Sequence, residues 1–390
     1  MKLEKGSISS KDLMFSVFCF MQGTVLRSGF IISVTRQDSW AMAITGFLLT
    51  LPILAVYTGL LRKFPGKNLI EIDDIVFGPV FGKILSALYL FFFVSLAALN
   101  TRDLGNFVAG YMMPETPIAA VTLVFLVGCA YALRKGIENL MHLSVLFTII
   151  AMGALAVNSI LLLKDVQPEF LKPFFQLKFP EFVQGTVSVA AVPMGEILAF
   201  TMITPMLEKG KKAGKPLLLG LALSAASMVF VIMRDIITLG PLVAIVSLPS
   251  FESMRYVSLA GILTRMESIY AVVLVILFLF KVSILLYAFV LGLTQMLSGK
   301  SPPRANPDHK GQSCETEQLQ GQHSAPPLML ISVAFVFFYS LFVFESMMEN
   351  MNWGATTAPF FSLTFEFLLP AVSLLVVCLR KIGKAQEVGA

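Results

Sequence analysis

The sequence predicts an all-α polytopic membrane protein with ten transmembrane helices, arranged as two inverted five-helix repeats in which helices 1 and 6 are broken. The first observation is composition: the 390 residues are 56% hydrophobic and only 14% charged, with a mean hydropathy of +0.81. The second is a set of apolar runs that reach the roughly 20 residues a spanning helix needs. The third is a pair of opposite charges, Lys281 and Glu196, inside two of these runs.

The apolar runs place the helices along the chain. We expect them at 12–32, 40–61, 80–111, 117–133, 138–163, 184–207, 216–239, 265–297, 327–344 and 357–379. Segments 12–163 and 184–381 would form the two repeats of one transmembrane domain that occupies residues 1–390. Segment 62–78 mixes acids with spaced apolar residues, which predicts a short interfacial helix. Segment 299–326 is polar and rich in Pro, Ser and Gln, which predicts a disordered cytoplasmic loop.

The distribution of basic residues supports this count and orients the chain. With the N-terminus in the cytoplasm, the inner segments hold nineteen of the 29 lysines and arginines, the outer segments hold nine, and Lys281 is the remaining one. Lysine and arginine are enriched on the cytoplasmic side of membrane proteins. We therefore expect a multi-pass integral membrane protein with both termini in the cytoplasm. The first helix would be its own insertion signal, because no cleavable signal pattern precedes it.

Composition and motifs argue against several classes of protein. The basic residues are spread over short loops instead of forming one stripe, which argues against binding of nucleic acid. The four cysteines and three histidines have no metal-site spacing. The chain has no glycine-rich phosphate loop and no plausible Ser/His/Asp set, and its few histidines disfavour acid–base catalysis. We therefore expect that the protein is not an enzyme and binds no cofactor. We expect its helices to contact membrane lipid.

Two predicted helices are interrupted near mid-span. Proline removes a backbone donor and glycine tolerates unwound backbone, and in lipid the freed groups must be satisfied by protein or by a ligand in a cavity. Breaks in the first and sixth helices are typical of transporters built from inverted repeats, whose ligand sites lie between the broken segments. The alternative is an ordinary kink or a notch for close packing. The residues expected to line a cavity are Gln22, Gly23 and Thr24 in helix 1 and Pro193, Gly195 and Glu196 in helix 6.

Lys281 and Glu196 are candidate functional residues because charges at bilayer depth are expensive. Three interpretations are open. The two side chains form a structural ion pair, or they contact the carboxylate and the amine of a ligand, or one of them titrates and carries a proton. Glu366 in helix 10 is a further deep acid and a weaker candidate.

Other polar residues lie nearer the ends of their helices. We expect Asn100 in helix 3 to face the cavity. Arg102 with its neighbour Asp103 predicts a local ion pair or an interfacial anchor, and Arg234 with Asp235 predicts the same in helix 7.

Short motifs over nearly the whole chain resemble the B subunits, or spore permeases, of bacterial spore germinant receptors, within the amino acid/polyamine/organocation transporter superfamily. Each motif is weakly specific, and their order and spacing carry the resemblance. They are 9–12 before helix 1, Gly23 and Thr24 within it, 38–40 opening helix 2, 64–71 after it, 78–85 entering helix 3, Thr101 and Arg102 near its end, Gly195, Glu196 and Pro205 in helix 6, and 264–268 opening helix 8.

The resemblance implies a ten-helix, inverted-repeat protein of the spore inner membrane, in complex with a germinant-receptor A subunit and a lipoprotein C subunit. It implies sensing of a small nutrient, commonly an amino acid, among helices 1, 3, 6 and 8. The matching positions here are Gly23, Phe92, Glu196 and Lys281. The chain departs from the family at Arg27, where apolar residues and a proline are usual, and at Lys281, which many members lack; both leave the ligand's identity open, a more acidic ligand included.

Two other functions fit the same residues. The first is a proton-coupled amino acid or amine permease that acts alone, because a fold does not decide a function. The second is a membrane scaffold with a vestigial cavity, in which the polar core would have no effect on signalling.

Overall fold

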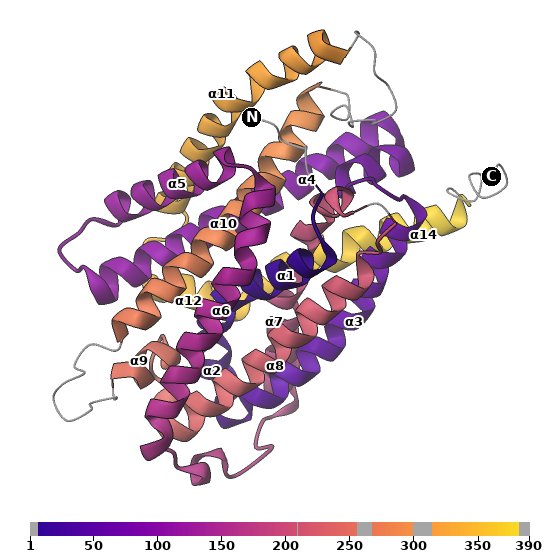
Figure 1. Cartoon of the computed structure of the whole chain (residues 1–390). Helices are drawn as coiled ribbons and strands as arrows, with labels where there is room; N and C mark the ends of the chain where they lie inside the picture. Colours follow the sequence, from indigo (N-terminus) through magenta and orange to yellow (C-terminus); the bar gives the residue numbers. More distant parts are fainter. Residues whose placement is uncertain (1–6, 209, 256–266, 299–313, 382–390) are drawn as a thin grey trace.

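The computed structural model describes residues 7–208, 210–255, 267–298 and 314–381, which form a bundle of helices (Figure 1). The α-helices are α1 (Ser10–Val25), α2 (Gly29–Thr35), α3 (Ser39–Lys63), α4 (Leu69–Phe107), α5 (Ile118–Arg134), α6 (Ile137–Leu161), α7 (Phe179–Ala191), α8 (Gly214–Leu239), α9 (Pro249–Arg255), α10 (Glu267–Ser298), α11 (Cys314–Phe342), α12 (Met347–Thr356), α13 (Ala358–Leu363) and α14 (Leu369–Leu379).

Short 3₁₀- and π-helical segments join or extend these helices. The 3₁₀ segments are η1 (Arg36–Asp38), η3 (Leu162–Lys164), η4 (Pro168–Leu171), η5 (Met194–Met202), η6 (Thr204–Met206) and η7 (Gly240–Ala244), and the π-helical ones are η2 (Val108–Met112) and η8 (Thr364–Leu368). Within the described ranges, β-structure is limited to one isolated bridge between Ile8 and Leu207.

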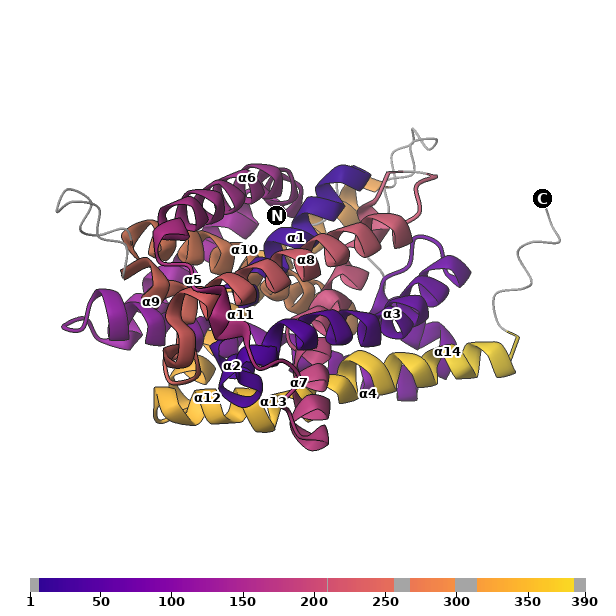
Figure 2. The same cartoon turned by 90° about the horizontal axis from the view of Figure 1, so that it is seen from below.

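The helices α1 and α10 lie at the centre of the bundle. Helix α1 packs against α6, α8 and α10, α10 also packs against α4, and α3 packs against α7 and α8. Figure 2 shows α6 along one edge of the bundle and α12, α13 and α14 along the opposite edge. Large apolar side chains cover the outer surface, with Val124 73% and Phe342 82% exposed, as expected for a surface in contact with lipid.

Several helices have the length and apolarity of membrane spans. Among the described residues, seven helical stretches are long and apolar enough to cross a membrane. The bent pair formed by α11, from Pro327 onward, and α12 would be an eighth if it is one span. The long stretches include α4 with η2 (Leu69–Met112) and α10 (Glu267–Leu297). The protein is therefore an all-helical, multi-pass integral membrane protein.

The first predicted helix is divided by a turn. The backbone leaves the α-helical conformation at 26–28 and resumes at Gly29. Gly23 remains helical, so the interruption lies one turn later than its position suggested. Arg27 N–H donates to the Thr24 carbonyl at 2.9 Å, and Ser28 accepts from Ile31 N–H at 3.0 Å, so part of the turn's backbone is satisfied internally.

The sixth predicted helix changes character at Pro193. Helix α7 ends at Ala191, Val192 is extended with φ −125° and ψ 107°, and the chain continues as the 3₁₀ segment η5. Proline has no backbone N–H, so it cannot continue the α-helical ladder of α7. Glu196 lies near the start of η5, where the backbone is wound as a 3₁₀-helix and does not continue α7.

The remaining predictions hold in part. Helix α4 begins with a capping box between Asn68 and Glu71 and bends at Gly78, whose φ is +80°, so the short helix predicted at 62–78 starts at Leu69. In segment 299–326, residues 299–313 lie outside the described part, and from Cys314 the backbone is helical in α11. The disordered loop expected at 299–326 stays a prediction.

Close packing of α1 on α8 generates a stability prediction. A Cβ added at Gly220 of α8 would lie 2.6 Å from the Met14 carbonyl oxygen and 2.7 Å from Val17 Cβ of α1. We expect Gly220→Ala to lower the free energy of unfolding by about 1–3 kcal/mol, the usual effect of overpacking. Thermal unfolding in detergent micelles measures this.

Gly153 of α6 is the matched control, because nothing lies within 4 Å of the Cβ that alanine would add. Gly153→Ala should leave the unfolding temperature unchanged or raise it, since alanine is favoured over glycine in helices by about 0.5–1 kcal/mol. Equal effects of the two substitutions would contradict the packing argument.

Candidate functional site

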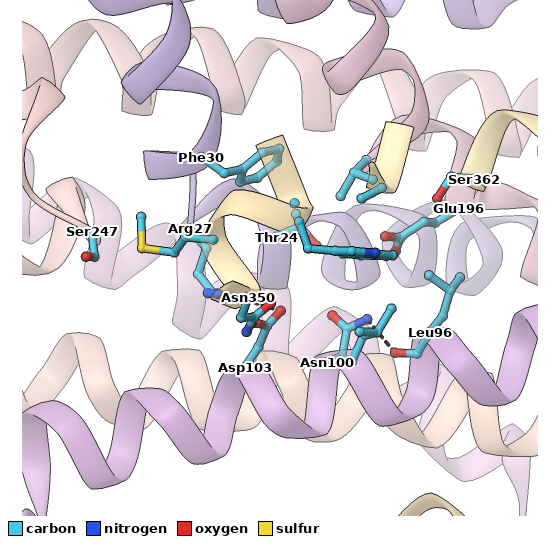
Figure 3. Close-up of a pocket in the computed structure, with 16 residues that line it drawn as sticks. Thr24, Arg27, Phe30, Leu96, Asn100, Asp103, Glu196, Ser247, Asn350 and Ser362 are labelled. Atoms are coloured by element: carbon cyan, nitrogen blue, oxygen red, sulfur yellow. Dashed lines mark hydrogen bonds and ion pairs between the residues drawn. The ribbon is translucent and has the colours of Figure 1, made fainter. Parts of the chain in front are cut away.

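A hollow of about 700 Å³, partly open to solvent, lies between the two interrupted segments. Figure 3 shows Asn100 and Asp103 on α4 on one side of it, with Thr24 and Arg27 of the first interrupted segment and Glu196 of η5 facing them. The lining residues are Thr24, Arg27, Phe30, Leu96, Leu99, Asn100, Asp103, Val192, Glu196, Ser247, Asn350, Met351, Trp353, Gly354, Ala358 and Ser362.

One end of the pocket is formed by a buried ion pair between α10 and η5. Lys281 Nζ lies 2.5 Å from Glu196 Oε2, and both side chains are almost completely buried. Lys281 also donates to Thr24 Oγ1, and its ammonium lies 5.0 Å from the centre of the Phe20 ring. The lysine therefore joins α10 to α1 and η5 and leaves one edge of Glu196 facing the pocket.

The other end of the pocket holds a second ion pair. Arg27, in the turn after α1, pairs with Asp103 of α4. Asp103 Oδ1 also accepts a hydrogen bond of 2.6 Å from Asn350 Nδ2 of α12. In Figure 3 these three side chains form one group, away from Glu196 and Ser362. Asp103 therefore connects three separate elements at the pocket.

Arg102 and Asp103 do not pair with each other, so the predicted local ion pair is wrong. Consecutive residues on a helix point in different directions, and the two side chains reach different elements. The Arg102 guanidinium donates to the carbonyl oxygens of Ser340, Leu341 and Phe344, at 3.4, 3.0 and 2.7 Å. These carbonyls belong to the end of α11 and the bend that follows it, so Arg102 satisfies a helix end inside the bundle.

Helix α12 forms one wall of the pocket. It is bent by 98° from α11 and brings Asn350 and Trp353 to the pocket. The Ser346 side chain caps its start, and Gln184 Nε2 of α7 donates to the Ala355 carbonyl near its end at 2.8 Å. Hydrogen bonds at both ends and the contact with Asp103 hold this wall in place.

The structure brings together only some of the predicted site residues. Thr24, Asn100 and Glu196 line the pocket, and Lys281 lies directly behind Glu196. Asn100 donates from Nδ2 to the Leu96 carbonyl in its own helix at 2.8 Å, a bond that leaves its amide oxygen uncommitted.

The other predicted residues do not line the pocket. Gln22 is directed at α8, where its Oε1 accepts from Ser227 at 3.1 Å. Gly23 packs against Leu277 and the Lys281 stem. Phe92 stacks on Phe365 with ring centroids 4.9 Å apart. Pro193 ends α7, while Gly195 lies against Glu366, since a Cβ there would be 2.7 Å from the Glu366 carboxyl carbon.

The predicted site residues do not include five polar residues of the pocket: Arg27, Asp103, Ser247, Asn350 and Ser362. Sequence reasoning expects Asp103 in a local ion pair or an interfacial anchor, and Asn350 lies between the helices predicted at 327–344 and 357–379. The signal for α12 was present in the sequence, since Ser346 and Glu349 have the spacing of a helix N-cap.

The local pair predicted in α8 is present. Arg234 Nη2 lies 2.6 Å from Asp235 Oδ1, and both side chains are buried. Asp235 also accepts hydrogen bonds from Ser250 and Ser253 of α9, so the pair fastens α9 to α8 and lies outside the pocket.

Comparison with known proteins identifies relatives over most of the chain. Residues 7–304 match the family described as "Spore germination protein". The chain is 25% identical over 395 aligned positions to Spore germination protein KB of Bacillus subtilis (strain 168), covering 99% of each. It is 24% identical to the Putative spore germination protein YfkT of the same organism, over 70% of this chain and 75% of that one.

A solved structure shares the fold. A Na⁺-coupled sialic acid symporter, in a substrate-bound outward-open state, superimposes with a TM-score of 0.64 at 11% identity, covering 93% of this chain and 79% of that one. The described chain therefore has a transporter-like helical fold.

The buried ion pair predicts how single and double substitutions differ. Lys281→Met leaves the Glu196 carboxyl without its cation, and loss of one partner of a buried pair typically costs about 3–5 kcal/mol. Lys281→Met combined with Glu196→Gln removes both charges at similar volume and should recover most of that loss. Thermal unfolding of the purified variants compares them; a double variant as unstable as the single one would contradict this pairing.

Proposed function

Because the chain belongs to the spore germination protein family, we propose that it is the membrane-embedded B subunit of a spore germinant receptor and that it senses an amino acid-like nutrient. The observation that carries the proposal is the pocket with an acidic group at each end, Glu196 and Asp103, each with a basic partner. The family supports the role in germination, and the pocket supports the binding of a small polar molecule.

The charges of the pocket favour a ligand that is itself a zwitterion. Both cations near the pocket, Arg27 and Lys281, already have acidic partners. A purely anionic ligand would add negative charge between Glu196 and Asp103, whereas a zwitterion adds no net charge. Its ammonium can interact with Glu196 and its carboxylate with donors of Arg27 other than Nη1, which pairs with Asp103. Asn100 adds a neutral polar group between the two ends, Ser362 adds a hydroxyl at the Glu196 end (Figure 3), and Trp353 adds an aromatic surface.

Binding would be signalled by a shift between two arrangements of the bundle. The pocket lies where α4, α12, η5 and the turn after α1 meet, so a ligand that fits one arrangement better changes their populations. The shift cannot exceed the ligand's difference in affinity for the two states. Of the three interpretations of Lys281, the contacts favour pairing with Glu196, with only the glutamate facing the ligand.

We also propose the finer topology of ten spans in two inverted repeats, with both termini in the cytoplasm. Besides the stretches with the length of spans, α1 and the apolar helix α5 are available as shorter spans. The turn at 26–28 and the change of backbone at Pro193 would be the breaks of the first and sixth spans. The distribution of basic residues supports the orientation.

The partners are part of the same proposal. We expect an A subunit and a lipoprotein C subunit in the spore inner membrane, as in the germinant receptors that the motifs resemble. Genes for such subunits next to this one would support the assignment.

Asn100 provides the test of the pocket. Asn100→Leu removes the amide oxygen at similar volume, and loss of one hydrogen bond to the nutrient should raise the concentration for half-maximal germination about tenfold. The germination of spores that carry the variant is followed over a series of nutrient concentrations, with the protein level checked by immunoblot.

The matched control is Asn139→Leu on α6, since Asn139 makes the same kind of bond, to the Lys135 carbonyl at 2.7 Å, but is exposed and remote from the pocket. It should respond like the unaltered protein. A normal response of the Asn100 variant and of the Glu196→Gln, Lys281→Met double variant to every nutrient, at normal protein level, would reject the pocket. Uptake of nutrient by the purified protein in liposomes would instead favour a permease.

A further inference from the structure

Four fully buried polar side chains lie outside the pocket and take no part in the proposed nutrient site. They are Tyr57 on α3, Asp73 and Tyr89 on α4, and Glu366 on the π-helical segment η8, and none is more than 1% exposed. Three of the four have side-chain oxygens without a hydrogen-bond partner among the described protein groups. Unsatisfied polar atoms in a protein interior are uncommon and call for a specific explanation.

Glu366 lies next to the charged end of the pocket. Among the residues that the structure describes, neither of its carboxyl oxygens has a hydrogen-bond partner, and the group interacts electrostatically with Glu196 and Lys281. Its carboxyl presses against Gly195, where no side chain separates it from η5. Single-turn π-helices are frequent at functional sites, and this one turns Glu366 into the bundle.

Two buried tyrosines, Tyr57 and Tyr89, link Glu366 to Asp73 through their interactions. The Tyr57 hydroxyl donates to the Glu366 backbone carbonyl, which fixes the phenol beside the carboxyl. Tyr89 is within electrostatic range of both Tyr57 and Asp73, and its hydroxyl has no partner. Tyr57 is therefore in contact with the Glu366 segment, and Tyr89 interacts with Tyr57 and with Asp73.

Asp73 ends this row near a second hollow. Its Oδ1 accepts from Ser373 Oγ of α14 at 3.1 Å, and its Oδ2 has no partner. The next residue, Asp74, lines a hollow of about 620 Å³ with Lys83 and Ser86, at the end of the bundle where α4 begins. The Ser86 hydroxyl is buried and unpartnered as well. In the proposed topology this end faces the cytoplasm.

A purely structural role does not account for this row. Polar side chains that hold membrane helices together do so through hydrogen bonds to each other. Among the described residues, the row makes one such bond, from Ser373 to Asp73, while Tyr57 donates to the backbone carbonyl of Glu366. Buried carboxyls without donors are expensive unless they carry a proton or are reached by water. Acids, hydroxyls and water in sequence are the components of a proton relay.

We propose that Glu366, Tyr57, Tyr89 and Asp73 form a hydrated proton path that connects the charged end of the pocket with the hollow at the start of α4. The path ends on Glu366, which exchanges its proton with the solvent of that hollow.

Each transfer conserves atoms and charge. The Glu366 carboxyl releases a proton to a neighbouring water, and each water or tyrosine hydroxyl that accepts a proton on one side releases its own on the other. The Asp73 carboxylate accepts the last proton and passes it to water in the hollow, while the electron pair of each broken O–H bond stays on its oxygen. Glu196 and Lys281, which face Glu366 from η5 and α10, would feel the change of charge.

The test measures proton exchange at Glu366 without any nutrient. The purified full-length protein in lipid nanodiscs is transferred from H₂O to D₂O, and the infrared carbonyl stretch of protonated carboxyl groups is followed over time. The band that disappears in Glu366→Gln belongs to Glu366. Tyr89→Phe and, independently, Asp73→Asn should slow its exchange by about a hundredfold, the smaller end of what a positioned proton-transferring group contributes.

Tyr339→Phe serves as the matched control, because it also removes one phenol hydroxyl, which bonds Ser95 outside the row. It should leave the rate unchanged within the error of the measurement. The proposal is overturned if no protonated band disappears in Glu366→Gln, if the band never exchanges, or if either row variant exchanges as fast as the control. Because nutrient is absent, these outcomes leave the nutrient pocket untouched.

Discussion

A charge at the depth of a bilayer must find an opposite charge, and this requirement organises the centre of the protein. Lys281 comes from an otherwise apolar helix, and its ammonium is held by Glu196, Thr24 and the face of Phe20. These partners lie on α1 and η5, so a single side chain of α10 fixes how the three segments approach one another. The desolvation of two charges is tolerated only because each compensates the other.

The interruptions of the helices follow from the same requirement. A continuous α-helix uses all of its backbone groups and offers none to a ligand or a neighbouring side chain. Arg27 lies in the turn after α1 and pairs with Asp103. Pro193 follows the end of α7 and precedes η5, which carries Glu196. Backbone irregularity and buried charge therefore occur at the same place, and the pocket forms between them. Stability near the pocket depends on polar contacts, which a ligand of suitable charge can replace.

The proposed sensing role and the proposed proton path share one feature, the Glu196 end of the pocket. A nutrient ammonium placed there would interact with the same group that faces Glu366. The two carboxyls and Lys281 thus form a small electrostatic unit in which a change at one group alters the others. This gives a physical means by which occupation of the pocket is communicated across the bundle, without requiring that the nutrient itself crosses the membrane.

The sequence alone determined the membrane class, the helical fold and the two residues whose charges pair at its centre. Hydropathy, the spread of basic residues and isolated charges are properties of the chain read in order, and lipid restricts what such a chain can form. Near the two predicted breaks, Gly23 is helical with a turn following at 26–28, and Val192 is extended before Pro193; that these are the breaks of the first and sixth spans stays a proposal. The family was accessible from short motifs in fixed order.

Only the tertiary structure decided which side chains reach the pocket. Arg102 and Asp103 are neighbours in sequence, yet one satisfies the end of α11 and the other joins Arg27 and Asn350. Phe92 is directed into an aromatic stack, and α12 folds back at 98° to supply Trp353. These outcomes depend on the rotation of each helix about its axis and on contacts between residues far apart in sequence. The local sequence pattern determines neither the rotation of a helix nor its long-range contacts, because helix rotation in a bundle is set by packing against neighbouring helices.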